Sequence, residues 1–101
     1  MKKRLKLQVK LEEILGSRNV YYEPPESLKI EYPCIIYKRD AMNTLHADDI
    51  LYRSIDGYQV TIIDKTADSP IIDKIKVLPM CRFNRHFTSD GLHHDVFTLY
   101  F

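Results

Sequence analysis

The sequence predicts an α+β fold in which an antiparallel sheet of about four strands is flanked by two helices. Three observations predict this class: apolar residues with helical spacing near the start, short central segments rich in β-branched and aromatic residues, and two aromatic runs around a Ser-Asp-Gly turn. The expected element order is α-β-β-β-α-β-β. A chain of 101 residues has room for a single domain, 1–101.

The first predicted element is an amphipathic helix within residues 1–17. The apolar residues at the spacing of one helical face are Leu7, Leu11, Ile14 and Leu15. Gly16-Ser17 is a typical helix end. Residues 20–25 are expected to be extended and then broken, because Pro24 and Pro25 cannot donate backbone hydrogen bonds.

The centre of the chain predicts two strands joined by a polar arm. Residues 34–38 are short, apolar and β-rich, and residues 58–64 place Tyr58, Val60 and Ile62 on one face. We expect these two strands to pair. Residues 39–55 form the most polar segment and are predicted to be a long loop or arm; long loops in small domains tend to carry function.

The second half predicts a helix over 70–78 and a terminal hairpin of strands 80–87 and 93–101. Ser69 is a good N-cap and Pro70 suits the first helical position. In the hairpin, alternation places Phe83 and Phe87 in the core. The polar residues between them are predicted to face water, namely Arg82, Asn84 and His86. On the last strand Phe97, Leu99 and Phe101 share the core face.

The titratable residues do not form a convincing catalytic or metal site. His93 and His94 are adjacent, so on a strand they point to opposite faces and do not share a metal easily. Cys81 and His86 are five residues apart, which would place them on opposite faces of a strand. The glycines stand singly, so no phosphate-binding loop is present. The sequence therefore predicts a non-enzymatic protein with no cofactor and no metal.

Composition limits the ligands and the cellular compartment that we expect for this chain. The formal net charge of +1 does not favour nucleic acid as the primary ligand. Cys34 and Cys81 stand alone in apolar runs, which is typical of buried thiols in a reducing compartment. No segment has the pattern of a membrane span. The basic and aromatic residues of 82–87 keep a nucleic-acid-binding module using the C-terminal hairpin open as the alternative function.

Several strings resemble one family. They are residues 22–27 (YEPPES), 32–37 (YPCIIY), 58–64 (YQVTIID), 85–92 (RHFTSDGL) and 96–101 (VFTLYF). This combination resembles the small tail-completion proteins of siphophages and prophages of Gram-positive bacteria, relatives of the lambda-type tail terminator and tail-to-head joining proteins. The resemblance covers most of the chain from residue 20 onward, although this chain is shorter than the larger terminators.

The resemblance implies a tail-terminator-like fold and a ring of identical subunits, with a hexamer favoured, at the head-tail junction or tail end. The implied partners are a phage tail-tube or head-completion protein, and no membrane. In such rings a polar loop commonly reaches a neighbour or the tube, and the matching charges here are Arg39, Asp40, Asp48, Asp49 and Arg53. A DNA channel would be faced by the basic residues Lys2, Lys3, Arg4 and Lys6, for which a solvated helix face is the simpler interpretation. The implied location is the bacterial host cytoplasm during assembly, then the virion.

Overall fold

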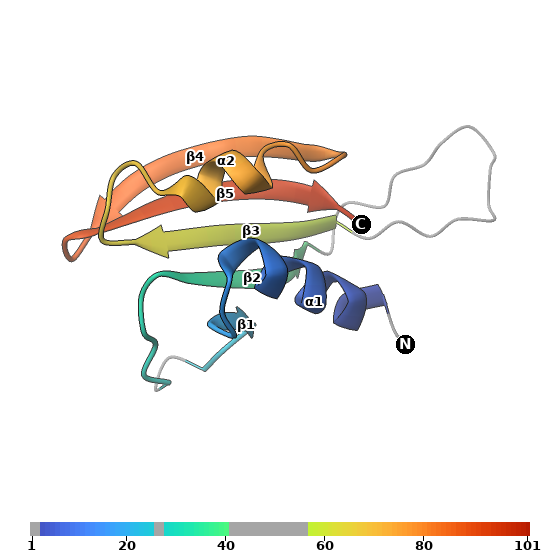
Figure 1. The fold of residues 1–101 in the computed structure, drawn as a ribbon, viewed down its shortest axis with the longest axis horizontal. Coiled ribbons are helices and arrows are strands. Elements are labelled where there is room, and N and C mark those ends of the chain that lie inside the picture. Colours follow the sequence, from blue (N-terminus) through green and yellow to red (C-terminus); the bar gives the residue numbers. More distant parts are fainter. Residues whose placement is uncertain (1–2, 26–27, 41–56) are drawn as a thin grey trace.

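The computed structural model describes residues 3–25, 28–40 and 57–101. The elements follow the predicted order (Figure 1). They are α1 (Lys3–Leu15), β1 (Val20–Tyr22), β2 (Cys34–Asp40), β3 (Gly57–Asp64), α2 (Pro70–Ile75), β4 (Cys81–Ser89) and β5 (Leu92–Tyr100). The α+β class with two helices is therefore confirmed.

The sheet differs from the predicted antiparallel four-stranded sheet because it has five strands in the order β1-β2-β3-β5-β4. β1 runs parallel to β2, with Val20 opposite Ile35, whereas the other neighbouring pairs are antiparallel. The extended residues after α1 thus join the sheet as a short edge strand. Parallel strands need a crossover connection, which residues 23–33 provide here.

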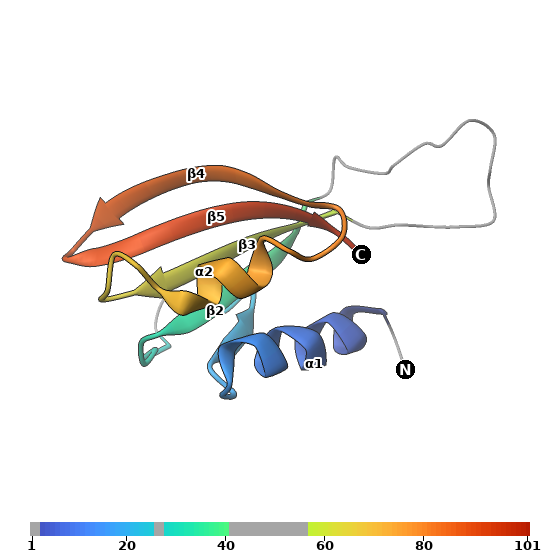
Figure 2. The same ribbon diagram turned by 45° about the horizontal axis from the view of Figure 1, so that its top comes forward.

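Both helices cover the same face of the sheet, which we call the helix face (Figures 1 and 2). The core lies between them and the sheet. It consists of apolar side chains from α1, β1, β2, β3, α2 and β5, namely Leu7, Leu11, Ile14, Val20, Ile35, Tyr37, Tyr58, Val60, Ile62, Ile71, Ile75, Phe97 and Leu99. We call the opposite side the open face, because no helix in the described part of the chain lies on it.

Polar contacts add to the apolar packing between α1 and the sheet. The buried Tyr37 hydroxyl donates to Oε1 of Gln8 at 2.6 Å, and Nε2 of Gln8 donates to the Val20 carbonyl at 3.0 Å. Tyr37 also lies between the rings of Tyr22 and Tyr58, with centroid separations of 5.0 and 6.1 Å. Burial raises the pKa of Tyr37, which keeps its hydroxyl protonated as a donor.

Three local signals for element ends are confirmed, whereas α2 ends at Ile75 and not at the predicted residue 78. Gly16 has φ 79° and its N–H donates to the Glu12 carbonyl, which ends α1. The Ser69 hydroxyl accepts from the Ile71 N–H, and Pro70 is the first helical residue of α2. Asp90 and Gly91 both have positive φ, as a type I′ hairpin turn between β4 and β5 requires.

Candidate interaction surface

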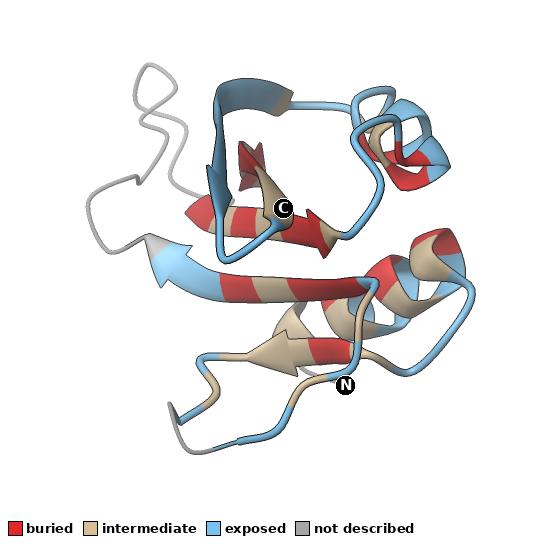
Figure 3. Ribbon diagram, turned by 90° about the vertical axis from the view of Figure 1, so that its left-hand side faces the viewer, coloured by how far each residue is buried: buried red, intermediate tan, exposed pale blue. Residues whose placement is uncertain are grey.

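β4 forms one edge of the sheet and is exposed on both of its faces. Among the described strands its partner is β5. Every β4 residue except the half-buried Cys81 is exposed (Figure 3), as the sequence predicts for Arg82, Asn84 and His86. An edge strand presents unpaired backbone groups that can pair with another chain. This nine-residue edge is therefore a candidate interface.

A β-bulge divides β4 into two parts. Phe83 pairs with Phe97 and Arg85 pairs with the adjacent Val96, which leaves Asn84 as the extra residue. Directly paired residues share a face of a sheet. The bulge therefore reverses the alternation of faces along β4. Two residues on either side of Asn84 that strict alternation would place on the same face lie on opposite faces.

The expectation that Phe83 and Phe87 belong to the core is wrong. Their exposed fractions are 54% and 38%. Phe83 lies on the helix face and meets Phe97 edge-on at 5.5 Å, whereas Phe87 lies on the open face and stacks on His94 at 4.5 Å. Alternation reports which residues share a side of a strand, but the edge position and the bulge decide what covers each side.

Exposed apolar residues lie just before β4 and in its first half. Val77 is 74% exposed, Met80 is 50% exposed, and Phe83 follows them along the chain. We call these three residues the β4 apolar surface. A cavity of about 260 Å³ adjoins this surface, because Met80 also lines the cavity. The other lining residues come from α1, from the segment before β4, from β5 and from the residue after it, namely Leu7, Lys10, Leu78, Pro79, Leu99, Tyr100 and Phe101. Exposed apolar area of this kind commonly marks a protein interface.

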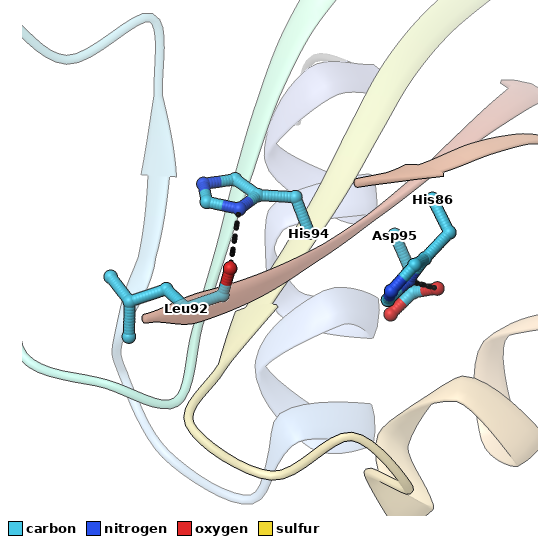
Figure 4. Close-up of polar contacts among 4 residues, drawn as sticks. All are labelled: His86, Leu92, His94 and Asp95. Atoms are coloured by element: carbon cyan, nitrogen blue, oxygen red, sulfur yellow. Dashed lines mark hydrogen bonds and ion pairs between the residues drawn. The ribbon is translucent and has the colours of Figure 1, made fainter. Parts of the chain in front are cut away.

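The histidines of the hairpin serve the packing of β4 on β5. Nδ1 of His86 lies 2.8 Å from Oδ1 of the buried Asp95 (Figure 4). The His86 ring also stacks on the ring of His93, with a centroid separation of 5.7 Å. His94 points to the other face, where its Nδ1 lies 3.2 Å from the Leu92 carbonyl. The predicted opposite orientation of His93 and His94 is confirmed. In residues 3–25, 28–40 and 57–101, no group of three or more His, Cys, Asp or Glu side chains is arranged to hold a metal.

The two thiols are free and held in the protonated form. Burial, with a smaller contribution from the negative charge of Asp64, raises the pKa of the Cys34 thiol to about 12, and burial also raises the pKa of Cys81. The prediction that Cys81 and His86 lie on opposite faces is wrong, because the bulge restores them to the same face. Their partners on β5 are four residues apart, a separation of about 14 Å along the strand.

The predicted arm lies mostly outside the described residues. Arg39 and Asp40 belong to β2, where they pair with Tyr58 and Gly57, so the strand continues two residues beyond the predicted boundary. The remaining arm charges, Asp48, Asp49 and Arg53, fall within 41–56 and are not described.

The basic residues predicted to face a channel have different positions. Lys2 is outside the described residues and Lys3 begins α1. The Arg4 guanidinium lies over the Tyr22 ring at 4.5 Å, so it packs against the sheet, whereas Lys6 is exposed. Arg4 and Lys6, the two of these residues whose side chains are described, therefore do not form one basic surface.

Sequence reasoning missed the β4 apolar surface. The apolar run of residues 77–80 carries a signal, because it follows a helix too short to bury it, but the edge position of β4 has no local signature. No helix in the described part of the chain is long and apolar enough to cross a membrane. Comparisons with models of protein families, with curated proteins and with solved structures found no match for this chain.

Proposed function

We propose that this chain is a non-enzymatic structural subunit of a phage or prophage, which associates with copies of itself into a ring at the head-tail junction or at the tail end. The observation that carries self-association is the β4 apolar surface beside the edge strand β4, whose outer side pairs with no other strand of the described residues. The phage setting, the preference for a hexamer and the tail-tube or head-completion partner rest on the resemblance of the sequence to tail-completion proteins.

Burial of this surface would supply binding energy. In the single subunit Val77 is largely exposed and Phe83 is about half exposed. Complete burial of an apolar side chain of this size contributes about 1.5–3 kcal/mol. Association also requires desolvation and loss of freedom, so these residues would act as central contacts within a larger interface.

A second apolar surface lies on α1. Leu5 and Val9 are 40% and 45% exposed and, at 100° per residue, lie on the side of α1 opposite Leu7 and Leu11. α1 contacts β1 and β2 at one end of the sheet, whereas β4 forms the other edge. A head-to-tail ring needs two different patches on each subunit, and these two surfaces supply them.

The test compares the oligomeric mass of two variants that carry the same charge. Val77→Glu with Phe83→Glu lowers the net charge by two, and Lys74→Glu on the exposed side of α2 does the same. Light scattering at rising protein concentration should give ring-sized mass for the wild type and for Lys74→Glu. The double variant should remain a folded monomer, with its circular dichroism spectrum unchanged.

Two results would contradict this function. A wild type that stays monomeric at every concentration, in the presence of tail-tube protein as well as alone, would exclude ring formation. Equal ring mass for the double variant and Lys74→Glu would show that the β4 apolar surface is not the contact.

A further inference from the structure

The open face of β3, β5 and β4 carries a consistent set of side chains. Register places three cross-strand rows on this face: Gln59 with Thr98 and Arg82, Thr61 with Val96 and Arg85, and Ile63 with His94 and Phe87. Arg82 and Arg85 are exposed, and the neutral polar residues are half-buried. The bulge at Asn84 matters here, because it brings both arginines to the same face.

The charge on this surface has one sign. Among the described residues of these three strands, no Asp or Glu lies on the open face. Lys38 lies further away on β2 and lines a pocket together with Glu23, so the cationic part is centred on β4. By register Asp40 belongs to the open face, on β2 opposite Gly57, and is separated from β4 by β3 and β5. The cationic surface of β3, β5 and β4, which carries no carboxylate itself, is complementary to a polyanion.

Phe87 holds one of the two cations in place. The Arg85 guanidinium lies over its ring at 5.5 Å, and the His94 ring stacks on it at 4.5 Å with an interplanar angle of 12°. Because these two groups occupy the ring, Phe87 orients Arg85 rather than serving as a bare stacking surface for a base. A cation held in this way loses less freedom when it binds an anion.

We propose that the open face of β3, β5 and β4 binds single-stranded nucleic acid. Phosphates meet Arg82 and Arg85, and the partner rows on β5 set these residues about 7 Å apart along the strand. Gln59, Thr61 and Thr98 lie beside them and offer hydrogen bonds to bases laid on the sheet. In a duplex the bases are paired and turned inward, so they form fewer hydrogen bonds with these three side chains. This proposal does not depend on ring formation, because it uses the face opposite the β4 apolar surface.

The test measures binding of a fluorescently labelled single-stranded oligonucleotide by anisotropy. With two phosphate contacts the association constant should fall about 7-fold between 50 and 200 mM salt. Arg82→Gln with Arg85→Gln should weaken binding at low salt and reduce this dependence to less than about 2-fold. The matched control, Lys65→Gln with Lys74→Gln, removes the same charge from residues outside the three strands and should bind as the wild type does.

Competitors decide the kind of ligand. Unlabelled single strands should displace the probe more effectively than a duplex of the same sequence or polyglutamate. Equal competition by the duplex would overturn the assignment to single strands, and equal competition by polyglutamate would assign the face to acidic polypeptide. An equal loss of binding in the lysine control would show that net charge alone is responsible, and the proposal would fail.

Discussion

Truncation of two phenylalanines that face each other across β4 and β5 should have very different consequences. Phe97 is 1% exposed and belongs to the core, whereas Phe83, its partner on β4, is 54% exposed. Phe97→Ala should lower the free energy of unfolding by about 3–5 kcal/mol, out of a total of about 5–15 kcal/mol. Phe83→Ala should cost about 1–2 kcal/mol, because about half of its burial is absent and the edge-on ring contact contributes about 0.5–1.5 kcal/mol.

Thermal and urea unfolding followed by circular dichroism will measure both losses. For a domain of this size the melting temperature should fall by about 12–40 °C for Phe97→Ala and by about 4–16 °C for Phe83→Ala. The measurements belong at low protein concentration, where self-association does not add stability. Losses that are equal within about 0.5 kcal/mol would refute the edge position of β4 and support the core position that alternation predicts.

Three further predictions concern side chains away from this pair. The pKa of the Cys34 thiol is raised from 9.0 to about 12 in the folded state, so the protonated thiol contributes fully to stability below pH 9, and this contribution is lost as the pH rises from 9 to 12. Cys34→Ala should therefore flatten the decline of the free energy of unfolding in urea above about pH 9. The same decline with pH in Cys34→Ala and the wild type would contradict this. His86→Ala should lower the free energy of unfolding by about 1–3 kcal/mol, because it leaves the buried Asp95 carboxylate without that partner. His94→Ala should lower it by less than about 1 kcal/mol. A lower melting temperature for His94→Ala than for His86→Ala would disprove the stabilising role of the His86–Asp95 contact. Ser69→Ala should cost about 1 kcal/mol through loss of the α2 cap, and a melting temperature equal to that of the wild type would argue against the cap.

Local sequence signals predicted most of the fold because they act over a few residues. The stripe of α1, the Ser69-Pro70 start of α2 and the Asp90-Gly91 turn depend on neighbouring residues alone. The parallel pairing of β1 depends on where residues 23–33 deliver the chain, which has no local signature. The α+β class was therefore predictable, whereas the mixed five-stranded sheet was not.

The candidate surfaces were less predictable for the same reason. Phe83 and Phe87 have the spacing of core residues, yet the bulge at Asn84 sends them to opposite faces of an edge strand. Bulges and edge positions are set by long-range pairing with β5, which composition and periodicity do not report. The arginines on either side of Asn84 share the open face for this reason alone.

Electron microscopy of particles tests the central claim most directly. A phage or prophage that carries this gene would be induced with the Val77→Glu/Phe83→Glu form and, in parallel, with the charge-matched Lys74→Glu form. We expect separate heads and tails, or tails of abnormal length, from the double variant, and complete particles from the control. Complete particles in normal number from the double variant, or from a strain without the gene, would contradict a structural role at the head-tail junction or tail end.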